Sequence, residues 1–120
     1  MSVNKGKEDP LRPIVGRQLS AVVFVQDYVQ LQFDGPGLTA ITWPAVVVGN
    51  TKYEYGRPGY RDALCERIAT IVSSTSVKEG EEIRIDFNDD SVLLISLKPE
   101  NYSGAEAAIF HNGTEDTWVW

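Results

Sequence analysis

The stretch YVQLQFDGPG, residues 28–37, decides the fold because it joins an alternating segment to a turn. Val29, Leu31 and Phe33 alternate with two glutamines, and a period of two residues is typical of a strand with one buried face. The four residues that follow, Asp34-Gly35-Pro36-Gly37, are all turn formers. The stretch therefore predicts the first half of an antiparallel hairpin.

A second hairpin follows in the other half of the chain. Glu82 to Phe87 alternates in the same way, Asn88 to Ser91 is a turn, and Val92 to Leu97 is apolar enough for a central strand. Residues 31–38 align with residues 85–92 at a constant offset of 54. Two hairpins that obey the same turn rules explain this match, and duplication of a hairpin is the alternative.

Further strands are expected around these two hairpins. Residues 15–25 are dense in apolar and β-branched side chains, and residues 38–48 continue as strand although Pro44 marks a bulge, a bend or an edge. Shorter candidates are residues 52–55, 106–110 and 117–120.

One helix is expected between the two hairpins, at about residues 60–74. Leu64, Ile68, Ile71 and Val72 lie at i, i+4, i+7 and i+8, the spacing of an amphipathic helix. Ser73 to Ser76 are weak helix formers and should fray its end. The predicted fold class is α+β, an antiparallel sheet built from hairpins with this helix packed on one face.

Length and composition indicate one domain. The chain has 120 residues, and 42% of them are hydrophobic, which suffices for a core. We expect a flexible N-terminal arm at residues 1–13 and a single domain at residues 14–120. The net charge of −6 argues against nucleic acid as a partner, because such binders must neutralise phosphates.

The chain lacks the usual signals for export, membranes and thiol or metal chemistry. Its beginning has no apolar signal region, and no stretch approaches the roughly 20 apolar residues of a membrane span. We therefore expect a cytoplasmic protein. Cys65, the one cysteine, should be a small buried thiol on the helix, and His111, the one histidine, an exposed loop residue. No metal, cofactor or catalytic residue is predicted.

Five segments together resemble a family of small uncharacterised bacterial proteins. They are residues 27–31, 33–35, 59–65, 95–97 and 106–108, and the resemblance spans about residues 11–110. It implies a bacterial source and a compact α+β domain. It supplies no catalytic residue.

Negative charge is concentrated in the second half of the chain, residues 61–120, which has five basic and twelve acidic residues. This favours a non-catalytic protein-binding domain that docks a cationic protein, because charge of one sign speeds encounter. An immunity protein that neutralises a basic nuclease toxin is one concrete form. A merely solvated hairpin is the alternative. The candidate partner-binding residues are Glu79, Glu81, Glu82, Asp86, Asp89 and Asp90.

Two other readings stay open. Several aromatic side chains in one region suit a small-molecule-binding or enzymatic domain with a pocket between helix and sheet, although they suit an ordinary core equally well. The residues that would line this pocket are Trp43, Tyr53, Tyr55 and Tyr60. A homo-oligomer built through a sheet edge is the third reading.

Overall fold

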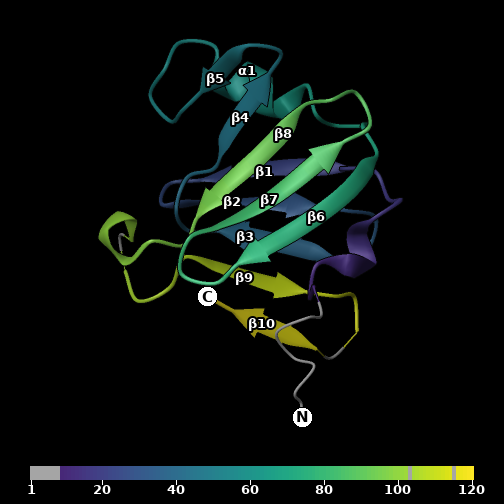
Figure 1. Ribbon diagram of the computed structural model, residues 1–120, viewed down its shortest axis with the longest axis vertical. Helices are drawn as coiled ribbons and strands as arrows, with labels where there is room; N and C mark the ends of the chain where they lie inside the picture. The colour runs from purple at the N-terminus through teal and green to yellow at the C-terminus, as the bar shows by residue number, and fades with distance from the viewer. Residues whose placement is uncertain (1–8, 103, 115) are drawn as a thin grey trace.

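The strands form two antiparallel sheets of five strands each, as Figure 1 shows for the computed structural model. The structure describes residues 9–102, 104–114 and 116–120. The first sheet has the order β1-β2-β3-β9-β10. Its strands are β1 (Ala21–Val25), β2 (Tyr28–Gln32), β3 (Gly37–Ala40), β9 (Ala108–His111) and β10 (Thr117–Val119).

The second sheet has the order β5-β4-β8-β7-β6 and lies in front of the first in Figure 1. Its strands are β4 (Ala45–Val48), β5 (Thr51–Tyr53), β6 (Val72–Lys78), β7 (Glu82–Phe87) and β8 (Val92–Ser96). Residues 38–48 therefore form two strands in different sheets, not one, and Pro44 lies in the connection between them.

Each half of the chain contributes to both sheets in the same way. The first half adds three consecutive strands to one sheet and a hairpin, β4–β5, to the other, and the second half repeats this with β6–β8 and β9–β10. The two connections between sheets touch, since the backbone amide of Thr42 donates a hydrogen bond to the carbonyl of Ala107 at 3.1 Å. The segments that precede β1 and β6 also pair, at Gln18 and Ile71.

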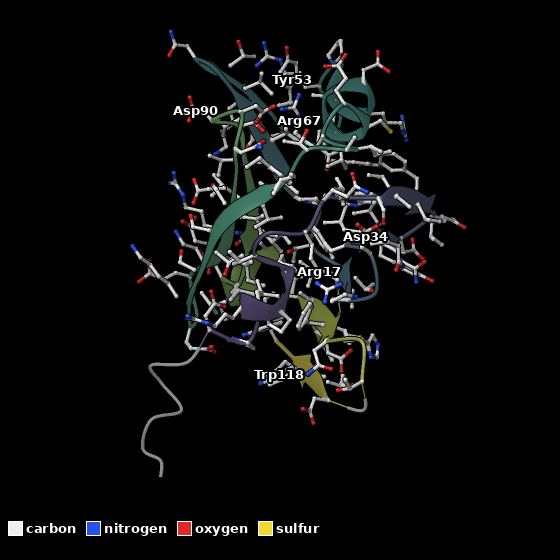
Figure 2. The ribbon with its side chains drawn as sticks, turned by 90° about the vertical axis from the view of Figure 1, so that its right-hand side faces the viewer. Arg17, Asp34, Tyr53, Arg67, Asp90 and Trp118 are labelled. Carbon is white, nitrogen blue, oxygen red and sulfur yellow. The ribbon has the colours of Figure 1, made fainter. Side chains whose placement is uncertain are left out.

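The two halves also share an arginine with the same role. Arg17 and Arg67 each donate from Nε to the carbonyl four residues earlier, at 3.0 and 3.1 Å. Arg17 then reaches the carbonyl of Asp34 in the β2–β3 turn, and Arg67 reaches the carboxylate of Asp89 in the β7–β8 turn. Figure 2 shows both arginines beside their turns. The two halves of the chain therefore share this arginine-to-turn contact as well as their strand arrangement.

The core lies between the sheets and confirms the predicted inward faces. Val29, Leu31 and Phe33 are fully buried, and the equivalent face of β7 is at most 2% exposed. Its side chains, those of Ile83, Ile85 and Phe87, belong to the same cluster as the first three. The alternation of both strands is thus explained by one apolar layer shared by the two sheets.

The predicted helix is present but much shorter than expected. It is α1 (Tyr60–Cys65), the only α-helix in the described part of the chain, and two short 3-10 turns, η2 (Arg12–Ile14) and η3 (Pro99–Asn101), accompany the strands. Ile68 and Ile71 are 40% and 42% exposed, so their predicted burial was wrong. Val72 is buried, but in β6, where Ser73 to Ser76 also lie.

The helix ends early because the backbone reverses at Ala69, which has a φ of 75°. The Ala69 amide donates to the carbonyl of Leu19 at 2.7 Å. The backbone here therefore pairs with the segment before β1 instead of continuing as a helix. The helix contacts β4 of one sheet and β1 of the other. The fold is therefore mostly antiparallel sheet with one short helix, and this helix bridges the sheets.

Three smaller expectations also changed. Cys65 is exposed, not buried, because it ends the short helix on its solvent side. Residues 15–20 precede β1 instead of belonging to it. Residues 1–8 of the expected flexible arm lie outside the described residues, whereas Leu11, within that arm, is fully buried.

Candidate functional site

The six acidic candidate residues lie in two groups at opposite ends of β7. Glu79, Glu81 and Glu82 surround the β6–β7 turn, whereas Asp89 and Asp90 lie in the β7–β8 turn with Asp86 just before it. A strand of six residues spans about 20 Å. The structure therefore does not bring the six carboxylates together on one surface.

At the β7–β8 turn, Asp89 holds the turn and Asp86 is paired with an arginine. Asp89 accepts hydrogen bonds from the amide and hydroxyl of Ser91 at 2.9 and 2.5 Å, and from Arg67 at 2.9 Å. Burial alone would raise the pKa of Asp89, but these hydrogen bonds and the charge of Arg67 outweigh it and lower the pKa. Asp86 pairs with Arg84 at 3.0 Å.

The group at the β6–β7 turn is different, and we call Glu79, Glu81 and Glu82 the acidic turn. Among the residues that the structure describes, no Lys or Arg nitrogen lies within 4 Å of these three carboxylates. Glu79 instead accepts a hydrogen bond from the indole Nε1 of Trp120 at 3.3 Å. Figure 1 shows the C-terminal end of the chain beside this turn. An aromatic ring therefore contacts one of three carboxylates that, in the described ranges, have no Lys or Arg nitrogen within 4 Å.

Three of the four aromatic candidate residues, Trp43, Tyr55 and Tyr60, come together beside α1 and β5. The rings of Trp43 and Tyr55 stack with centroids 4.3 Å apart, and Tyr60 meets Tyr55 edge-on at 5.9 Å. Tyr60 is buried and donates its hydroxyl to the carbonyl of Pro44 at 2.5 Å. Burial, followed by the neighbouring Tyr55, raises the pKa of Tyr60 well above its ordinary value, so this phenol stays protonated.

The fourth aromatic residue, Tyr53, lies against the loop that leads into the helix. Gly59 has a φ of 88°, so a side chain here would be strained, and its Cβ would lie in contact with the Tyr53 ring at 3.4 Å. The guanidinium of Arg57 lies over the Tyr53 ring at 5.1 Å. These contacts hold the loop close to β5.

Beside the aromatic cluster is an open hollow of about 360 Å³, lined by residues 55–62. Tyr55 is half exposed there, and two arginines, Arg57 and Arg61, contribute to the lining. The aromatic residues were predicted from their density in the sequence, whereas neither arginine was among the predicted pocket residues. The signal that was available is the run from Tyr55 to Arg61, in which aromatic, cationic and glycine residues alternate.

The remaining chemistry-bearing side chains are far apart. Cys65 ends α1 at one end of the molecule in Figure 1, whereas His111 ends β9 near the other. His111 was expected in a loop, but it is the last residue of a strand. His111 Nδ1 lies 3.1 Å from the hydroxyl of Thr117. In the described ranges, no three His, Cys, Asp or Glu side chains are grouped so that they could hold a metal ion.

Comparisons of the chain with protein-family models, with curated proteins and with solved structures gave no match. The resemblance to small bacterial proteins therefore stays a prediction, as does a cytoplasmic location. None of the helices described is long and apolar enough to cross a membrane.

Proposed function

We propose that this protein is a non-catalytic binding domain that docks a cationic protein surface at the acidic turn. The observation that supports the proposal is the contact between the Trp120 indole and Glu79. Glu79 belongs to a group of three carboxylates that have no cationic neighbour within 4 Å among the described residues. Aromatic residues are preferred anchors in protein interfaces. An immunity protein that neutralises a basic toxin is one protein of this kind.

The chemistry of such a surface suits lysine and arginine side chains. A cation can lie over the face of an indole ring and pair with a carboxylate at the same time, and each contact contributes modestly where water has access. Like charges held close together repel one another, and a cationic partner relieves this repulsion. The outer face of β7 is less suited, because Arg84 already neutralises Asp86 there.

The test uses a fluorescent nona-arginine peptide as a model of a cationic surface. We expect the double variant Glu81→Gln, Glu82→Gln to bind it about three- to tenfold more weakly at low salt, with a smaller difference at high salt. The indole NMR signal of Trp120 should shift when the peptide binds to the unaltered protein.

The matched control is the double variant Asp27→Asn, Asp34→Asn, which removes the same charge from the β1–β2 and β2–β3 turns of the first sheet. Asp34 has a φ of 55°, which asparagine also tolerates. Less than a twofold loss is expected for this control. An equal loss in both variants would show that only net charge matters and would contradict the proposal.

A further inference from the structure

We propose that the hollow lined by residues 55–62 is a binding site for a small molecule that joins a planar ring to an anionic group. This site is separate from the acidic turn. Figure 1 shows α1 and β5 at one end of the molecule and the β6–β7 turn toward the other, and Tyr53, labelled in Figure 2, marks the end with the hollow.

The charge of the hollow is opposite to that of the protein as a whole. Its lining has two arginines, Arg57 and Arg61, and one carboxylate, Asp62, whereas the net charge of the chain is −6. Within the described parts of the chain, no carboxylate oxygen lies within 4 Å of either guanidinium. Two arginine charges without an acidic partner suit an anion, because guanidinium groups form charge-assisted hydrogen bonds with carboxylates and phosphates.

Both guanidinium groups are held in place by contacts other than ion pairs. Arg57 lies over the Tyr53 ring and donates to the carbonyl of Lys52 at 2.8 Å. Arg61 lies over the ring of Phe24 at 5.7 Å. Ring faces orient a guanidinium without neutralising it, so the positive charge stays available and little side-chain entropy is lost when an anion binds.

The ring-binding part of the proposal rests on Tyr55. Its side chain is 50% exposed, yet the stack on Trp43 and the edge contact with Tyr60 fix its orientation. An ordered and half-exposed aromatic ring offers a planar ligand a stacking partner. The volume of about 360 Å³ lies at the lower end of the range for small-molecule sites, so a ligand with one ring fits better than a large cofactor.

The lining favours binding over catalysis. Tyr60, whose phenol is buried and donates to Pro44, does not act as a base at neutral pH. The two arginines and the Tyr55 ring together favour a ligand that joins a ring to a carboxylate or to a phosphate ester. The test separates these two classes of ligand.

The test is an NMR titration of the unaltered protein with four probes. Phenyl phosphate and benzoate combine a ring with an anion, inorganic phosphate has no ring, and benzyl alcohol has no charge. We expect the first two to shift the backbone amides of residues 55–62 at lower concentration than the last two. A response to phenyl phosphate alone identifies phosphate esters, and a response to both identifies carboxylates as well.

Variants connect the response to the named side chains. Arg61→Gln should weaken phenyl phosphate binding at least about tenfold, and Tyr55→Leu about three- to tenfold. The matched control is Arg12→Gln, an exposed arginine near the start of the described chain, for which less than a twofold change is expected. Amide spectra outside residues 55–62 report whether each variant keeps its fold.

Three results would overturn the proposal. The first is the absence of any shift at residues 55–62 with phenyl phosphate and benzoate. The second is an equal response to inorganic phosphate or to benzyl alcohol, which would remove the need for a ring or for a charge. The third is an equal loss of affinity in Arg61→Gln and Arg12→Gln. None of these results affects the acidic turn, which is tested with a different probe and different variants.

Discussion

Arg67 anchors the β7–β8 turn to the helix, because it is only 5% exposed and binds both Asp89 and the carbonyl of Ala63. Arg67→Gln should lower the free energy of unfolding by about 2–3 kcal/mol, less than for a fully buried pair because the Asp89 side chain is 45% exposed. Urea denaturation measures this change. Arg84→Gln, which breaks an exposed pair, should cost at most about 1 kcal/mol.

The same pair makes stability depend on acid. The pKa of Asp89 is lower in the folded protein than in an unfolded chain, so its contribution is present above about pH 4 and is lost as the pH falls below that value. Arg67→Gln removes one cause of the lowered pKa. Its free energy of unfolding should therefore fall less steeply between pH 5 and pH 2, and an unchanged slope would show that Ser91 alone sets this pKa.

Ala69 adopts a left-handed backbone conformation that glycine adopts without strain. Its φ is 75° and its side chain is exposed, so replacing it removes strain and no buried surface. Relief of this backbone strain, about 1–2 kcal/mol, exceeds the greater conformational entropy that glycine loses on folding. Ala69→Gly should therefore raise the free energy of unfolding by up to about 1 kcal/mol. Ala63→Gly, inside the helix, should have the opposite sign in the same denaturation experiment.

At this scale the sequence predicts apolar burial better than polar roles. Leu31 and Ile85 were placed correctly because alternation reports directly on a buried face. Arg67 was not identified, because an isolated arginine in a sequence is usually solvated and its partner lies 22 residues away. The recurrence of an apolar residue three positions before Arg17 and Arg67 was the available signal.

Among the elements, the short helix separates two positions that the sequence pattern treats alike. Leu64 is fully buried on α1, whereas Ile68 is 40% exposed beyond its end. Leu64→Ala should therefore cost about 2–5 kcal/mol, and Ile68→Ala less than about 1 kcal/mol. Thermal or chemical denaturation of the two variants measures the difference, and equal losses would mean that the helix continues to residue 68 in solution.

The error in the helix has a physical cause that local patterns do not contain. The spacing of Leu64, Ile68, Ile71 and Val72 fits a helix, but Ile71 faces solvent and Val72 faces the core as parts of an extended segment. Pairing of that segment with residues before β1, such as Gln18 with Ile71, stabilises the extended form. A contact between residues more than 50 positions apart overrides the local preference.

For the whole molecule, each half of the chain adds a hairpin to the sheet of the other half, which predicts that the two sheets unfold as one cooperative unit. Each sheet takes strands from both halves of the chain, and both pack on one core. We expect the amides of Leu31 in β2 and Ile85 in β7 to exchange hydrogen with the same free energy of opening, equal to that of global unfolding.

The internal comparison for this experiment is the edge strand β10, whose three residues are exposed. Its amides should exchange faster than those of β2 and β7, through local opening. Two distinct free energies for β2 and β7 would contradict the prediction, because they would mean that one half of the chain can open while the other stays folded.

The sequence also could not predict how the charged and aromatic candidates would be arranged in space. Asp89 and Glu81 are close in sequence but lie at opposite ends of β7, because a strand carries its two turns apart. Trp43 and Tyr55 meet because β4 and β5 form a hairpin, whose turn is signalled in the sequence by Gly49 and Asn50. Hairpin contacts were therefore within reach of sequence reasoning, and contacts across the whole fold were not.

The mixed origin of each sheet, with strands from both halves of the chain, also affects folding during synthesis. In the finished sheet, β3 lies between β2 and β9, and β9 is synthesised about 70 residues after β3. At about 5–20 residues per second, the ribosome leaves one edge of β3 without its partner for several seconds. An unpaired strand edge is a template for another chain. Neighbouring nascent chains on one messenger RNA are thus most exposed to mispairing in the interval between the emergence of β3 and that of β9.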